Sequence, residues 1–125
     1  MKKLIQKNRQ AAILFWFLTL SYMSLIFFLS SIAYPDIVPL PKNSDKVIHF
    51  FEYAVLSVLF FLSFKKSGVI RNILWLSIVL ATFYGITDEY HQSYVPGRYS
   101  SIGDVVADFI GSAAGALSLK LILKG

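Results

Sequence analysis

The stretch "AAILFWFLTLSYMSLIFFLSSIA", residues 11–33, contains no charged residue. A helix needs about 20 mainly apolar residues to cross about 30 Å of hydrocarbon, so this stretch predicts a transmembrane helix. The remainder of the chain has the same character, because 56% of its 125 residues are apolar and its mean hydropathy is +0.62. This composition is too apolar for a soluble domain of this size. We therefore expect an integral membrane protein.

Three further apolar runs lie at residues 47–64, 69–86 and 102–123, and we expect the helix of the second of these to continue to about residue 92. They lack the alternation of apolar and polar residues that marks barrel strands, and helices are the other structure that satisfies its backbone in lipid. The predicted fold is an all-α membrane protein, with residues 1–125 forming one domain and a bundle of four transmembrane helices.

The first run has an alternative interpretation as a signal peptide. Basic residues precede it, and the small residues of Ser31-Ile32-Ala33 fit a cleavage site. Its apolar core is longer than the usual 7 to 15 residues of a signal peptide, which favours a retained helix.

The charged residues predict the orientation. If the N-terminus is cytoplasmic, the inner segments hold nine of the twelve basic residues and no acid. These nine are Lys2, Lys3, Lys7, Arg9, Lys65, Lys66, Arg71, Lys120 and Lys124. We therefore expect both termini in the cytoplasm and all seven acids in the outer half. The net charge of +5 comes largely from these basic residues that set the orientation, so no nucleic-acid partner is expected. The chain has no cysteine and therefore no thiol chemistry.

Polar side chains recur at helical spacing in the second run. Asp45, His49 and Glu52 fall at i, i+4 and i+7 and share one face, with Tyr53 at its margin. An ionisable group facing lipid at the bilayer centre costs at least about 2.5 kcal/mol. Such groups should therefore face protein or a water-filled cavity and mark a functional path.

Matching stripes occur in the last two runs. Asp88 is followed by His91 and Gln92 at the outer end of the third helix, and Asp104 and Asp108 are one turn apart in the fourth. All three stripes lie in the outer half of the membrane. The sequence therefore predicts one convergent polar site.

Several of these residues have structural alternatives. Asp45 can simply stabilise a helix N-terminus, and Ser101 with Asp104 resembles a capping box. Glu89 and His91 can be solvated loop groups. Buried carboxylates such as Asp108 can belong to an inert polar network, although desolvation makes such a network a poor source of stability.

Gly111 and Gly115 form a GxxxG pattern on the fourth helix. This pattern favours close helix packing, either within the chain or between chains. A homo-oligomer through these two glycines is therefore one expectation.

The segment "YVPGR", residues 94–98, predicts a type II turn, with Pro and Gly at its central positions. The turn would return Arg98 over the outer helix ends. A guanidinium together with two helix N-termini suits a phosphate or carboxylate. Clustered carboxylates with two histidines suit a divalent cation or acid–base chemistry, and the sequence does not decide which cofactor, if any, is bound.

The segments "DKVIHFFEYAVLSVL" (residues 45–59) and "TDEYHQSYVPGRYSSIGDVVADFIGSAAG" (residues 87–115) resemble the VanZ-like family. These are small integral membrane proteins of bacteria, linked to resistance to the glycopeptide teicoplanin. The resemblance implies a place in the bacterial cytoplasmic membrane and a role at the cell envelope. Many family members carry Asn where this chain has Asp108, and the Asp makes a metal or proton role easier. The signature positions are Asp45, Lys46, His49, Tyr53, Asp88, Glu89, Gln92, Pro96, Gly97, Arg98, Asp104, Asp108 and Gly111.

Our favoured function is a binding or remodelling protein for an anionic, phosphorylated envelope lipid or lipid-linked cell-wall precursor, with an influence on glycopeptide susceptibility. Arg98 would bind the phosphate. The predicted substrate-binding residues are Arg98, Tyr53, Asp88, Glu89, Gln92, His91, Asp45 and Asp104.

The alternative is a metal-dependent intramembrane hydrolase or transferase acting on that lipid. His49, Glu52 and Asp108 are then the catalytic candidates, and Glu52, Asp88 and Asp108 would hold the metal. No HExxH, GxSxG or Walker pattern supports an enzyme, so the sequence leaves open whether a reaction takes place. A proton-coupled transporter is the least favoured class, because four helices without an internal repeat do not resemble transporter folds.

Overall fold

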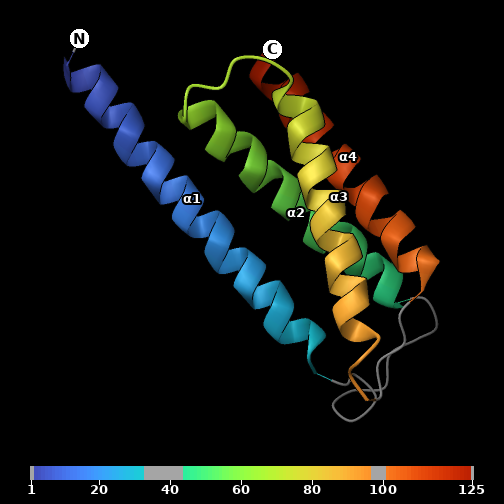
Figure 1. Cartoon of the computed structure of the whole chain (residues 1–125). Coiled ribbons are helices and arrows are strands. Elements are labelled where there is room, and N and C mark those ends of the chain that lie inside the picture. The colour runs from blue at the N-terminus through green and yellow to red at the C-terminus, as the bar shows by residue number, and fades with distance from the viewer. Residues whose placement is uncertain (1, 33–43, 97–100, 125) are drawn as a thin grey trace.

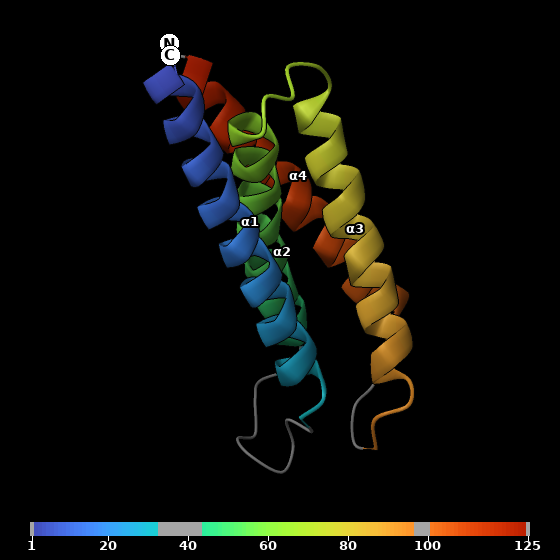
Figure 2. The same cartoon turned by 60° about the vertical axis from the view of Figure 1, so that its left-hand side comes forward.

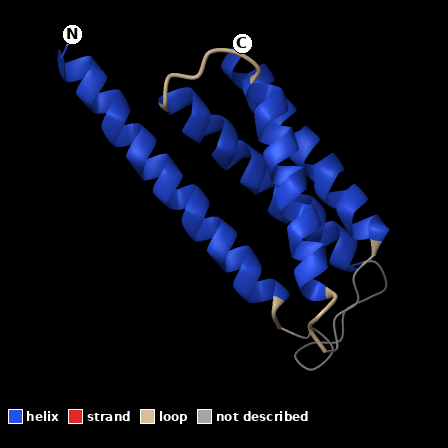
Figure 3. Cartoon of the chain, viewed as in Figure 1, coloured by secondary structure: helices blue, strands red, loops and turns tan. Residues whose placement is uncertain are grey.

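The computed structural model of the chain describes residues 2–32, 44–96 and 101–124. The four helices are α1 (Lys2–Ser30), α2 (Ser44–Lys66), α3 (Ile73–Gln92) and α4 (Ile102–Lys124). These ranges contain no strand (Figure 3). The predicted all-helical architecture is confirmed.

Among the described residues, three segments are long and apolar enough to cross a membrane: Asn8–Ser30, Ser44–Lys66 and Ile102–Leu123. Large apolar side chains, such as Phe17 and Trp75, point outward with more than half of their surface exposed, as side chains in contact with lipid tails do. The protein is thus an integral membrane protein. A membrane crossing by α3 stays a prediction.

Consecutive helices run in opposite directions (Figure 1). The start of α1, the end of α4 and the short connection between α2 and α3 lie at one end of the bundle, which we call the terminal end (Figures 1 and 2). The end of α3 and the starts of α2 and α4 lie at the other, which we call the loop end. As a result, α2 and α4 run parallel. They form the most extensive interface of the bundle, and α2 also packs against α1 and α3.

Two glycines allow α4 to approach α2 closely. A Cβ on Gly111 would overlap the main-chain oxygen of Phe50, and a Cβ on Gly115 would overlap that of Ala54. The GxxxG pattern therefore packs two helices of the same chain. The homo-oligomer predicted through these glycines is not tested by the structure of a single chain.

The third helix begins at Ile73 rather than at residue 69. The end of α2 is closed by a Schellman motif, in which the Val69 N–H donates to Phe64 O at 3.1 Å and the Gly68 N–H to Lys65 O at 3.2 Å. Gly68 has φ +89° and Asn72 has φ +60°, and both values belong to the left-handed region. Two such residues four positions apart place 69–72 in the connection between the helices.

Helix α1 is attached by polar contacts as well as by apolar packing. Buried Thr19 and Ser63 share a hydrogen bond of 2.8 Å between α1 and α2. Tyr hydroxyls add two more: Tyr22 donates to Glu52 O at 2.9 Å, and Tyr84 of α3 donates to Met23 O at 2.6 Å. Such bonds matter in lipid, where apolar burial drives helix association only weakly.

Candidate functional site

His49 of α2 and Asp108 of α4 form the centre of the polar site. Their side chains are 3% and 0% exposed, and His49 Nδ1 lies 2.7 Å from Asp108 Oδ1. An ionised carboxylate only accepts hydrogen bonds, so Nδ1–H is the donor to it. In the neutral ring this tautomer would leave a lone pair on Nε2, on the other side of the ring, whereas the imidazolium carries a proton on both nitrogens. Both residues were predicted to belong to the site.

Glu89 of α3 completes this group. Its Oε1 lies 3.7 Å from His49 Nε2, and its Oε2 accepts a hydrogen bond from the Ser101 N–H at 3.1 Å. Glu89 is 6% exposed and belongs to the last turns of α3, so its interpretation as a solvated loop group is wrong. Three helices thus converge on one imidazole.

Asp108 depends on a glycine opposite it. A Cβ on Gly85 of α3 would lie 2.5 Å from Asp108 Oδ2 and 3.0 Å from Asp108 Cβ. The sequence analysis did not select Gly85. An isolated glycine within an apolar helix is a signal for close packing, and it precedes Asp88 by three residues.

The three residues of this group can hold a metal ion. His49, Glu89 and Asp108 each offer one ligand atom, and these atoms lie within 4.8 Å of one another. Within the described ranges no other such group occurs, so Glu52 and Asp88, which were predicted as ligands with Asp108, lie outside it. Glu52 is half-buried, and its main-chain oxygen accepts the bond from Tyr22 of α1.

Further predicted residues are buried around the group. The Tyr53 ring lies parallel to the His49 ring, with an interplanar angle of 3° and centroids 6.2 Å apart. Tyr53 is fully buried, and its hydroxyl has no hydrogen-bond partner among the described residues. Asp88 and Gln92, one turn apart on α3, are also buried.

Lys46 connects the acids nearer the loop end. Its Nζ lies 3.6 Å from Asp104 Oδ1 and 3.7 Å from Asp45 Oδ2. Asp104 is buried, whereas Lys46 and Asp45 are each 41% exposed. The Asp104 N–H donates to Ser101 Oγ at 3.2 Å, so Ser101 caps α4 as its resemblance to a capping box suggested. The reciprocal bond of a capping box is made by another residue, because the Ser101 N–H donates to Glu89 Oε2.

The remaining predicted residues lie apart from this centre or outside the described ranges. His91 is half-buried against α1, where its Nε2 lies 2.9 Å from Ser31 Oγ and its ring stacks on Phe27 at 4.2 Å. Arg98, the predicted phosphate ligand, and the last residues of its turn lie outside the part of the chain that the structure describes.

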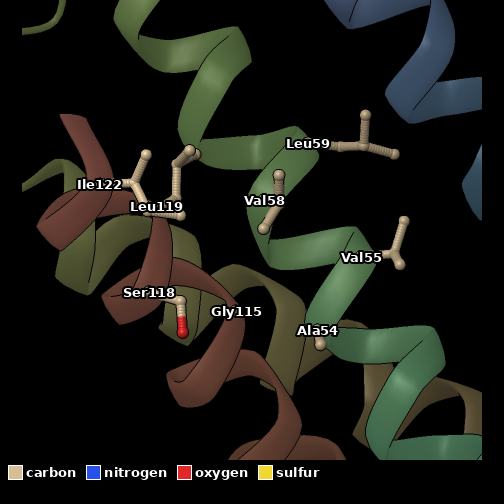
Figure 4. Close-up of a pocket in the computed structure, with 8 residues that line it drawn as sticks. All are labelled: Ala54, Val55, Val58, Leu59, Gly115, Ser118, Leu119 and Ile122. Carbon is tan, nitrogen blue, oxygen red and sulfur yellow. The ribbon is translucent and has the colours of Figure 1, made fainter.

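An apolar groove of about 400 Å³ follows the interface of α2 and α4 toward the terminal end (Figure 4). No charged side chain lines it. It begins at Ala54 and Gly115, which are five residues beyond His49 and seven beyond Asp108, about 8 to 10 Å along the helices. The groove and the polar group therefore both border the α2/α4 interface at different heights, and Val58, nine residues beyond His49, is on the opposite side of α2.

The arrangement has two chemical capacities. A histidine whose Nδ1–H is held by a carboxylate presents Nε2 as a metal ligand or as a general base. The second capacity is the binding of an amphipathic molecule, because a buried polar group and an apolar groove both border the α2/α4 interface.

A sequence profile of the VanZ/LLP1 family matches residues 15–123. An uncharacterised protein of Schizosaccharomyces pombe is 31% identical over 104 residues, which are 82% of this chain and 59% of that protein. The chain thus spans somewhat more than half the length of this relative. No solved structure gives a significant match.

Proposed function

The chain belongs to the VanZ/LLP1 family, and from this premise we propose that it binds or remodels an anionic, phosphorylated lipid of the cell envelope, or a lipid-linked cell-wall precursor. One observation carries the proposal: the buried polar group and the apolar groove share the α2/α4 interface. A lipid has the same order of parts, with a polar head followed by an apolar chain.

The proposed placement has the loop end on the outer side of a bacterial cytoplasmic membrane. All four helices cross the bilayer, and both termini are cytoplasmic. Two observations support it: α1 begins where α4 ends, at the same end of the bundle (Figure 2), and nine basic residues belong to that side. The head group then binds near Glu89 and Asp104, and its acyl chain enters the groove below.

The phosphate of the head group needs a cationic partner. Lys46 is half-exposed beside Asp104 at the loop end, and Arg98 is found in the sequence between α3 and α4. A guanidinium binds phosphate through two parallel hydrogen bonds, which gives Arg98 the larger expected share of the affinity. The carboxylates of the site would bind sugar hydroxyls or a bridging cation.

Native mass spectrometry of the detergent-purified protein tests this proposal. We expect wild type to retain a phosphorylated lipid that Arg98→Ala loses. Filling the groove with Ser118→Phe should also release it, whereas Leu117→Phe, an exposed position outside the groove, serves as the matched control. Equal retention by all four folded proteins would show non-specific annular lipid and overturn the proposal.

A role in glycopeptide susceptibility follows from such binding, because altered access to a cell-wall precursor changes the target of the antibiotic. Expression of wild type should change the teicoplanin tolerance of a bacterial host, and Arg98→Ala at equal expression should not. If wild type and Arg98→Ala change the teicoplanin tolerance of the host equally, the phenotype does not depend on the lipid site.

An enzymatic function is the second candidate, supported by the 2.7 Å contact between His49 and Asp108. In a hydrolase, His49 Nε2 would accept a proton from an attacking water, and Asp108 would stabilise the resulting imidazolium. Incubation with phospholipid and lipid-linked precursor should then yield a product of lower mass with wild type and none with His49→Gln. Intact lipid in both samples would refute the reaction and leave the binding function.

A further inference from the structure

We propose that His49 and Glu89 are ligands of one divalent transition-metal cation, Zn²⁺ being the best match, and that Asp108 holds His49 in position to bind it. The cation would bind the phosphate of the lipid at its open coordination positions. The inference rests on the proposed function for its purpose, but its test uses the metal alone.

The distance between the two ligand atoms suits a shared cation. His49 Nε2 and Glu89 Oε1 are 3.7 Å apart, which is too long for a hydrogen bond between them. Two ligands that each lie 2.0 to 2.1 Å from a tetrahedral zinc are separated by about 3.4 Å. A shift of a few tenths of an ångström therefore brings both atoms into coordination.

The other ring nitrogen has the partner that a metal ligand requires. A histidine that binds a metal through Nε2 commonly donates Nδ1–H to a carboxylate, which fixes the tautomer and the orientation of the ring. The contact of 2.7 Å between His49 Nδ1 and Asp108 Oδ1 has this arrangement. The Glu89 carboxylate is fixed in the same way, because its second oxygen accepts the Ser101 N–H.

Unpartnered buried polar atoms beside the group point to a missing charge or water. Asp108 is fully buried, and its Oδ2 has no hydrogen-bond partner within the described ranges. The Tyr53 hydroxyl also has no hydrogen-bond partner among the described residues, and it is close enough to Asp108 for an electrostatic interaction. A buried polar atom without a partner costs about 1 to 3 kcal/mol. A cation with its coordinated water would satisfy both atoms.

Zinc fits the donors better than magnesium does. Imidazole is a preferred ligand of zinc, whereas magnesium selects oxygen ligands. With two ligands from the protein, at least two positions stay open for water or phosphate oxygens. The resulting site would bind an anionic head group although several carboxylates surround it.

The test is zinc binding to detergent-purified protein that has been stripped with a chelator. Calorimetric titration with Zn²⁺ should give one site per chain in wild type. We expect Glu89→Gln and His49→Gln to weaken the site at least tenfold, and Asp108→Asn to weaken it by about 10- to 100-fold, the usual effect of losing such an orienting partner. Thr87→Ala, two residues before Glu89 on α3 but with an exposed hydroxyl that donates to Tyr84 O, is the matched control and should bind as wild type does.

Helical circular dichroism and a single monodisperse peak in size exclusion would establish that each variant is folded. No zinc binding by folded wild type would overturn the inference and leave His49 as an imidazolium paired with two acids. Equal affinity of wild type and Glu89→Gln would also overturn it, because the bound zinc would then lie elsewhere.

The outcome separates this inference from the proposed function. Lipid retained by protein without any zinc site would refute the metal and leave the lipid function standing. A zinc site in protein that retains no specific lipid would support the metal site and refute the lipid function.

Discussion

Replacement of Gly111 by alanine should destabilise the bundle through the α2/α4 interface. The new Cβ would lie 2.8 Å from the Phe50 carbonyl carbon and 2.9 Å from Phe50 Cα. Carbon atoms in contact are normally 3.5 to 4.0 Å apart, so the helices must separate locally by about 1 Å. Main-chain atoms cannot turn away as a side chain can, and we expect an overpacking cost of about 1 to 3 kcal/mol.

The matched control is Gly103→Ala on the same helix. Its Cβ would meet Lys46 Cε at 2.9 Å, and this end of a flexible side chain moves easily. Both substitutions gain up to about 1 kcal/mol from the helix propensity of alanine. The difference between the two variants therefore isolates the clash at Gly111.

Reversible unfolding in mixed detergent micelles, followed by helical circular dichroism, measures this difference. Gly111→Ala should be less stable than Gly103→Ala by about 1 to 3 kcal/mol. It should also lose zinc affinity, because a separation of about 1 Å takes the bond between His49 and Asp108 beyond hydrogen-bonding distance. Equal stability of the two variants would refute the close packing of α4 on α2.

Three further predictions concern the site, the attachment of α1 and the orientation. Gly85→Ala should displace the carboxylate of α4 that it faces and weaken zinc binding at least tenfold while helicity is retained; unchanged calorimetric titrations would contradict this. Thr19→Val should lower the free energy of unfolding by about 0.6 to 2 kcal/mol, and adding Ser63→Ala should cost less than it does alone, as a double-mutant cycle measures. The chain has no cysteine, so single cysteines at Lys66 and Tyr94 can be labelled selectively; an impermeant maleimide added to whole cells should modify the second and spare the first, and the opposite result would invert the topology.

The number of helices could be predicted because hydrophobic length is a property of the local sequence. The start of α3 could not, since Val69 and Ile70 are as apolar as the helix that follows them. What excludes them is the left-handed backbone of Gly68 and Asn72. Such a backbone has only a weak signal in composition.

The polar face of α2 could be predicted, but which neighbouring helix each of its residues contacts could not. Helical spacing puts His49 and Glu52 on the same side of α2. Packing alone decides that His49 meets Asp108 and Glu89, while the Glu52 main chain meets Tyr22 of α1. Gly85 was missed for the same reason, because its importance comes from the α4 side chain opposite it.

The parallel pairing of α2 with α4 means that the contact between His49 and Asp108 can close only after the last helix has been made. The ribosome releases α3, with its acidic end, before α4 exists. Until residue 108 has followed, His49 has no Asp108, and the Ser101 N–H that binds Glu89 has not been made. The contacts of His49 with Asp108 and of Glu89 with the Ser101 N–H are therefore among the last to form during synthesis.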